Sequence, residues 1–159
     1  MTTVIALRDV PESMEKAALW FSQKWGIPVD AYQKSIQNCI EQKTGIPQWY
    51  IVLDNQQQII AGAGIIDNDF HERKDLSPNL CALFVEPNDR QRGIAKTLLD
   101  FARKDLSTLN FKKVYLVTEL ESFYEKCGWA FHTFVADDGG QFMRMYVAST
   151  ECYKGNGDC

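Results

Sequence analysis

Hydrophobic residues recur with helical spacing in three stretches of the chain. The first stretch runs from Met14 to Trp25 and repeats apolar residues at i, i+3, i+4, i+7 and i+11, which is one face of an amphipathic helix. Gly26 follows it as a C-terminal cap. Two further helices are predicted, one from about Asp30 to before Gly45 and one from about Gly93 to Leu106.

Aromatic and β-branched runs separated by turn residues predict strands between and after these helices. Gly62 and Gly64 fall inside one such run, where glycine indicates a bulge or the close approach of another group. The polar stretch 67–78 is predicted to be a surface loop, a usual place for functional residues. The strands are expected at Trp49–Leu53, Gln58–Ile66, Asn79–Glu86, Lys113–Thr118, Trp129–Val135 and Gln141–Val147, with a short helix at Ser122–Lys126 before the last two.

The order of these elements predicts a mixed α/β fold. The strand–helix–strand unit from Asn79 to Thr118 is typical of two parallel neighbouring strands joined by a right-handed crossover. Hairpins on both sides add antiparallel strands, so we expect a twisted, mostly antiparallel sheet with a central parallel pair, flanked by helices. The chain shows no repeat or linker. Residues 1–147 are therefore expected to form a single domain, and residues 148–159 a polar, frayed tail.

Composition and charge narrow the class of partner. The 159 residues are 45% hydrophobic and 24% charged, as in soluble globular proteins, and the formal net charge is −4. An acidic chain is poorly suited to nucleic acids or anionic membranes, and no apolar run is long enough to span a bilayer. The five cysteines lack metal-ligand spacing, and the first residues lack a secretory pattern. We therefore expect a reduced, cytoplasmic protein that binds no metal.

A basic, glycine-containing segment lies where a buried strand is expected to lead into a helix. It comprises Arg90-Gln91-Arg92-Gly93-Ile94-Ala95, followed by Lys96. The first N–H groups of a helix have no partner within it, so a phosphate that approaches over the small residues 93 and 95 is a natural ligand. The segment matches neither GxxxxGK[ST] nor GxGxxG, which argues against nucleotide hydrolases and dinucleotide-binding folds. The alternative is a plain turn with a solvated basic cluster.

Two motifs, in this order, resemble the GNAT superfamily of N-acetyltransferases. The strand Leu83-Phe84-Val85-Glu86-Pro87, followed by Arg90-x-x-Gly93-x-Ala95, is similar to the acetyl-CoA motif of that family, Q/R-x-x-G-x-G/A. Downstream, Phe123-Tyr124-Glu125-Lys126-Cys127-Gly128-Trp129 is similar to its FYEKxGF segment. The resemblance covers roughly Trp49 to Val147, and the two leading helices fit the variable, substrate-side region of the family.

The resemblance implies acetyl-CoA as the cosubstrate. The strand before the motif would splay from its parallel neighbour and pair its backbone with the pantetheine, and the loop would hold the pyrophosphate. Tyr124 would protonate the leaving thiolate, since the pKa of a tyrosine, about 10, is close to that of a thiol, about 8.5. The cofactor-binding residues implied are Leu83, Phe84, Val85, Arg90, Gln91, Arg92, Gly93, Ile94, Ala95 and Lys96.

The general base stays open at this point. One protein-lysine branch of the family has a glutamate where this sequence has Asn79, and an asparagine cannot accept a proton. Glu119, Asp67, Asp69 or a water molecule are the remaining candidates, and each of these carboxylates is also compatible with an ordinary solvated position. Cys127 has no evident activating base, so we expect it to pack and the acetyl transfer to be direct.

We therefore expect an N-acetyltransferase that moves the acetyl group of acetyl-CoA to a primary amine in a ternary complex. The acidic charge balance and the asparagine at position 79 favour a small, cationic acceptor. Acetylation of a protein or peptide amine is one alternative, and a CoA-binding sensor without catalysis is another. A homodimer is compatible with the sequence, which does not identify the acceptor.

Overall fold

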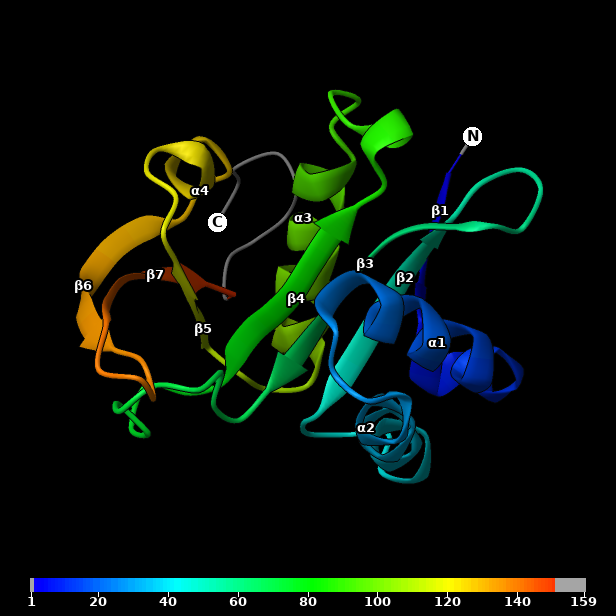
Figure 1. Ribbon diagram of the computed structural model, residues 1–159, viewed down its shortest axis with the longest axis horizontal. Helices are drawn as coiled ribbons and strands as arrows, with labels where there is room; N and C mark the ends of the chain where they lie inside the picture. The colour runs from blue at the N-terminus through cyan, green and yellow to red at the C-terminus, as the bar shows by residue number, and fades with distance from the viewer. Residues whose placement is uncertain (1, 151–159) are drawn as a thin grey trace. The chain divides into compact units, whose positions relative to one another are not determined.

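The computed structural model describes residues 2–150 and consists of short helices and strands (Figure 1). The first elements are β1 (Thr3–Ala6), α1 (Met14–Trp25), α2 (Val29–Glu41), β2 (Gln48–Leu53) and β3 (Ile59–Ile66). The others are β4 (Asn79–Val85), α3 (Ile94–Thr108), β5 (Lys113–Thr118), α4 (Phe123–Lys126), β6 (Ala130–Ala136) and β7 (Phe142–Ser149). Most boundaries lie within two residues of those predicted from the sequence.

The hydrogen-bonded strand order is β1-β2-β3-β4-β5-β7-β6. Strands β4 and β5 pair in parallel at Asn79 and Tyr115, whereas β1–β2, β2–β3, β5–β7 and β6–β7 are antiparallel. The predicted mixed fold, with a mostly antiparallel sheet and one parallel pair, is therefore confirmed.

Contacts within the chain gather into two compact units. Within the described residues, the first contains 2–65 and 82–98, and the second contains 66–81 and 99–150. The boundary falls inside β4 and inside α3, so each of these elements contributes residues to both units. The single domain over 1–147 stays a prediction, and the tail predicted from 148 lies outside the described residues from position 151 onward.

In the first unit, α1 and α2 pack against each other (Figure 1). Both helices contact β2 through aromatic rings. Phe21 of α1 meets the ring of Trp49 at 4.9 Å between centroids, and Tyr32 of α2 meets the same ring at 5.5 Å. These three side chains are almost fully buried. The apolar faces predicted for the two helices are thus the faces that cover the strand.

Gly62 and Gly64 in β3 make room for these rings. Of the two possibilities that the sequence left open, a bulge or a close approach, the structure shows the close approach. A Cβ atom at Gly62 would lie 2.7 Å from Phe21 Cζ. At Gly64 it would lie 2.5 Å from Cε3 of Trp49, the residue opposite it in β2. Both distances are well below van der Waals contact, so each glycine permits a close approach that no other residue allows.

Replacing Gly64 with alanine is therefore expected to lower the free energy of unfolding by about 1–3 kcal/mol, because the added methyl group forces the Trp49 ring out of its place. Urea unfolding measures this change. Gly139→Ala is the matched control, since a Cβ there would meet only Asp137 Oδ1 at 3.4 Å, an ordinary contact distance. Equal stability of Gly64→Ala and Gly139→Ala would contradict the packing.

In the second unit, β5, β7 and β6 pair side by side, and a small core of Leu76, Val135 and Met145 lies between the hairpin and the loop before β4. β7 continues two residues past the predicted end at Val147. Thr150, which follows it, is fully buried, and its N–H donates to Lys112 O at 3.0 Å. The frayed tail expected from position 148 is therefore wrong for residues 148–150.

The sequence reading also missed β1. Thr3–Ala6 pairs with β2, and Val4 lies opposite Val52. No helix within residues 2–150 is long and apolar enough to cross a membrane.

Candidate active site

The turn from β4 into α3 has the geometry of an anion-binding loop. Gln91 and Gly93 both adopt positive φ, +64° and +76°, and α3 begins directly afterwards at Ile94. The first turn of α3 contains no acidic residue that would compete with an anionic ligand. The first N–H groups of the helix have no acceptors inside it, and the dipole is positive at this end.

The approach to this helix end is open. Gln91, Arg92 and Gly93 are exposed, and a Cβ built on Gly93 would have nothing within 4 Å. A phosphate group can therefore come close to the backbone at this point, as the small residue at position 93 predicted. The exposed helix end therefore leaves room for an anionic group.

The two arginines of the loop are held differently. Arg90 is tied to its own strand, because its Nε donates to Val85 O at 2.8 Å and its guanidinium lies 5.2 Å from the centre of the Phe84 ring. Arg92 is exposed and forms an ion pair with Asp89, at 2.8 Å between Nη1 and Oδ1. Arg90 thus stabilises the turn as well as supplying charge, whereas Arg92 is held by a single surface ion pair.

We expect Arg92→Ala to weaken acetyl-CoA binding modestly, with a loss that shrinks as salt rises, because exposed charges are screened beyond about 8 to 10 Å at physiological ionic strength. Asp89→Asn should strengthen binding, since it removes a negative charge and releases the guanidinium of Arg92. Calorimetric titration with CoA at two salt concentrations measures both. Weaker binding by Asp89→Asn would show that the ion pair positions Arg92 for the ligand.

β4 carries an irregularity just before the loop. Ala82 has φ of +56°, which is rare for a residue with a side chain and typical of a bulge. Its carbonyl accepts a hydrogen bond from Trp25 Nε1 at 3.2 Å. Leu83 and Phe84, which follow, are half-buried, and Val85 is buried. The sequence reading missed both Ala82 and Trp25, because neither departs from the strand or helix pattern.

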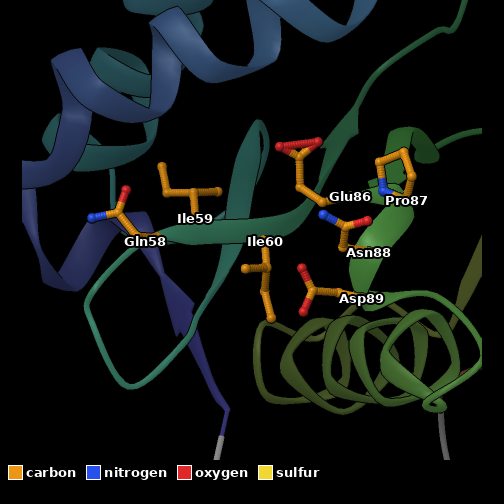
Figure 2. Close-up of a pocket in the computed structure, with 7 residues that line it drawn as sticks. All are labelled: Gln58, Ile59, Ile60, Glu86, Pro87, Asn88 and Asp89. Atoms are coloured by element: carbon orange, nitrogen blue, oxygen red, sulfur yellow. The ribbon is translucent and has the colours of Figure 1, made fainter.

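A pocket of about 440 Å³ lies beside the same turn (Figure 2). Figure 2 shows that one side comes from Gln58, Ile59 and Ile60 at the start of β3, and the other from the turn that begins at Glu86. Its two carboxylates are already paired, Glu86 with Lys24 at 2.7 Å and Asp89 with Arg92. An acidic lining is unfavourable for a polyanion, so this pocket is not the candidate phosphate site.

Tyr124, the candidate acid, belongs to the second unit and lies in α4. Its ring is buried among three other aromatic rings, those of Phe123 at 4.9 Å, Tyr146 at 5.9 Å and Trp129 at 6.2 Å between centroids. Burial raises the pKa of Tyr124 to about 12, and the charges of Cys127 and Asp69 act in the same direction. The hydroxyl therefore stays protonated at neutral pH and is able to donate a proton.

The candidate bases differ in their surroundings. Asp67 and Glu119 are exposed, and each accepts a hydrogen bond, from Ser77 Oγ at 2.9 Å and from Gln141 Nε2 at 3.2 Å. Asp69 is half-buried, and burial raises the pKa of its carboxyl, partly opposed by the nearby His71. Its negative charge helps to raise the pKa of Tyr124 and the pKa of Cys81. Of the three, Asp69 is the one that shares an electrostatic environment with the tyrosine.

Two of the buried cysteines, Cys39 and Cys81, are poor nucleophiles in these surroundings. Burial raises the pKa of Cys39 to about 11 and that of Cys81 well above its ordinary value, so both are protonated thiols at neutral pH. Cys127 is buried at the end of α4, while the nearby His132 has its ring beside Tyr115, at 5.7 Å between centroids. Within residues 2–150, no group of three His, Cys, Asp or Glu side chains is arranged to hold a metal ion.

The cofactor-binding residues expected from the sequence all lie in the first unit, on β4, its following turn and the first residues of α3. Tyr124 and Asp69 lie in the second. The roles assigned to these residues stay predictions. Asn79 and His71, which are buried side chains next to Asp69, were not recognised as a structural pair, because their partnership depends on how the loop folds.

A mixed sheet with one parallel pair, and an exposed glycine turn that leads from β4 into α3, are features that the resemblance to acetyltransferases predicts. Residues 47–131, more than half of the chain, match the family described as "Acetyltransferase (GNAT) domain". The chain therefore belongs to the GNAT acetyltransferase family, and the acyltransferase class expected from the sequence is confirmed. No curated protein matches the sequence.

Solved structures share this fold at low identity. A point mutant of the spermidine N-acetyltransferase SpeG from Vibrio cholerae is 18% identical with a TM-score of 0.67, over 99% of this chain and 98% of that one. The dodecameric spermidine N-acetyltransferase from the same organism is 17% identical with a TM-score of 0.67, over 98% and 97%. A candidate GNAT acetyltransferase from Desulfovibrio desulfuricans is 12% identical with a TM-score of 0.66, over 94% and 99%.

Proposed function

We propose that this protein transfers the acetyl group of acetyl-CoA directly to a primary amine of a small, cationic molecule. The observation that carries the proposal is the open helix end at Gly93, in a family whose members are acetyltransferases. The net charge of −4 favours a cationic acceptor, and the fold relatives that act on spermidine make polyamines the first acceptors to test. A homodimer or larger assembly is part of the proposal, since one fold relative is dodecameric.

In this proposal, different residues of the chain bind the cosubstrate and donate the proton. The backbone of Leu83–Val85 would align the pantetheine, and the N–H groups around Gly93 would hold the pyrophosphate, with Arg92 adding charge. Acetyl-CoA supplies an activated thioester when bound. Tyr124 would then protonate the departing thiolate. Its high pKa keeps the hydroxyl protonated at neutral pH, so the proton is available for transfer.

Direct transfer, without an acetylated cysteine, is part of this proposal. Burial keeps the thiols of Cys39 and Cys81 protonated, so neither of these two is suited to carry the acetyl group. The two substrates would then have to be present together, and initial-rate plots at several fixed amine concentrations should intersect rather than run parallel.

A free-thiol release assay tests the function. Acetyl-CoA is supplied with spermidine, with a short diamine and with a lysine-containing peptide, each at equal concentration. Release that depends on the polyamine or diamine supports the proposal, and release only with the peptide would assign a protein acceptor. Tight CoA binding without release for any amine would indicate a sensor.

A further inference from the structure

A network of buried hydrogen bonds fixes the loop between β3 and β4. Asn79, fully buried at the start of β4, accepts hydrogen bonds at Oδ1 from the Asp69 N–H at 3.0 Å and from His71 Nε2 at 2.5 Å. Its Nδ2 donates to Leu76 O at 2.8 Å. One amide side chain thus fixes the loop at three places.

His71 completes this network and is itself fully buried. Its Nδ1 accepts from the Arg73 N–H at 3.1 Å, so the ring proton is assigned to Nε2, which donates to Asn79. Asn68 accepts the His71 N–H at 3.1 Å and donates to its carbonyl at 3.1 Å. Asp69 lies between Asn68 and His71. Asn68 is bonded to His71, and His71 is bonded to Asn79 and Arg73, so the backbone of Asp69 is fixed.

The Asp69 carboxylate has no such partners. Within residues 2–150, no hydrogen bond or ion pair is formed by its oxygens, although the side chain is half-buried. A carboxylate withdrawn from water without a partner is unfavourable, and native proteins rarely maintain one without a use. The exposed carboxylates Asp67 and Glu119, by contrast, are already hydrogen-bonded. A rigid backbone that presents an unpaired carboxylate is the arrangement expected of an ammonium-binding group.

Resting on the acetyl transfer proposed above, we propose that Asp69 binds the ammonium group of the acceptor and removes its proton, and that Asn79 and His71 are positioning residues that hold Asp69 in place. Asn79 stands where one branch of the family has a glutamate. In this chain Asp69, in the loop before β4, would supply the carboxylate instead, and Asn79 holds the backbone N–H of Asp69.

The protons balance in this scheme. A primary amine with a pKa of about 10 arrives as an ammonium ion at pH 7 and gives one proton to the Asp69 carboxylate. The neutral nitrogen forms a bond to the acetyl carbon, the carbon–sulfur bond breaks, and the sulfur takes the Tyr124 proton. The nitrogen then gives a second proton to the Tyr124 oxygen, and Asp69 releases its own to solvent. The products are an amide, a thiol and one proton.

The test compares Asp69→Asn with Asp75→Asn, a control in the same loop whose carboxylate is exposed and paired with Arg73 at 2.8 Å. For Asp69→Asn we expect kcat/KM for spermidine to fall about 100-fold at pH 7, with KM for acetyl-CoA unchanged. The deficit should shrink as the pH approaches the pKa of the amine, because the acceptor then arrives neutral. Asp75→Asn should match the wild type at every pH.

Wild-type activity in Asp69→Asn, or a large loss only in Asp67→Asn, would overturn the assignment and leave the acetyltransferase function intact. If the wild-type protein released no thiol with any amine, the proposed function would fail separately. Calorimetric binding of spermidine would then decide the Asp69 assignment, supported by binding that Asp69→Asn loses and overturned by equal binding in both.

The positioning role has its own readout. Asn79→Ala should raise KM for the amine at least about tenfold and leave KM for acetyl-CoA unchanged, because only the Asp69 side of the reaction is disturbed. An equal rise in both KM values would make Asn79 a packing residue and overturn its role. If Asn79→Ala does not fold, Asn68→Ala provides a second test. Asn68 is half-buried, and the substitution removes its two bonds to the His71 backbone. The same comparison, KM for the amine against KM for acetyl-CoA, then decides the role.

Discussion

Acetyl-CoA binding should be strongly weakened in a Gly93→Val variant. A branched side chain at this position would fill the open space through which a phosphate reaches the backbone N–H groups at the start of α3. A lost hydrogen bond to a charged group costs about 1.5–3 kcal/mol. We therefore expect the affinity for CoA to fall about tenfold to a hundredfold for each bond that is lost. Isothermal titration with CoA measures the change.

The control must separate this steric effect from backbone strain. At φ of +76°, valine is strained whatever the space around it, at a cost of about 1–3 kcal/mol. Gly45 lies in the same unit with φ of +85° and also has nothing within 4 Å of an added Cβ. Gly45→Val should therefore lose similar stability and keep its CoA affinity. Unchanged CoA affinity in folded Gly93→Val would remove the loop from the cofactor site.

The sequence was informative wherever one short segment decides its own conformation. The apolar period of α1 and α2 and the β-branched runs of β2 and β5 predicted those elements directly. Gly62 and Gly64 indicated a bulge or a close approach, and the structure shows the close approach of aromatic rings. The loop around Gly93 was recognisable for the same reason, since a glycine before an amphipathic helix is a local signal.

The sequence was uninformative wherever distant residues decide. β1 is only four residues long and lacks apolar alternation, so its strand conformation depends on pairing with β2. Ala82 and Gln91 adopt positive φ although their residue types disfavour it, because the surrounding chain imposes those conformations. The same limit applies to the candidate base. Asp67 and Asp69 look equivalent in sequence, and only the fold separates them. Asp67 is exposed and its carboxylate accepts a hydrogen bond from Ser77, whereas Asp69 is half-buried and its N–H donates to Asn79.

The largest effect on the rate is expected from Tyr124→Phe. General acid catalysis contributes about 10² to 10⁴ in rate, so kcat should fall within that range while CoA binding is retained. Phenylalanine keeps the ring contacts with Phe123, Trp129 and Tyr146, so stability should change little. The variant removes one hydroxyl, for which no hydrogen-bond partner is found among residues 2–150.

The dependence of that loss on pH identifies the role of the hydroxyl. With a pKa of about 12, Tyr124 remains a proton donor throughout pH 6 to 9, so its own titration adds no step to the profile. The need for an acid instead falls as the pH approaches and passes the pKa of a free thiol, about 8.5, where the thiolate leaves unaided. The ratio of wild-type to Tyr124→Phe turnover should therefore be largest at pH 6 and smallest at pH 9.

The measurement requires saturating acetyl-CoA and conditions in which chemistry limits the rate. A ratio of one at every pH would leave Tyr124 as part of the aromatic packing, whereas a constant ratio well above one would point to orientation of the thioester rather than proton donation.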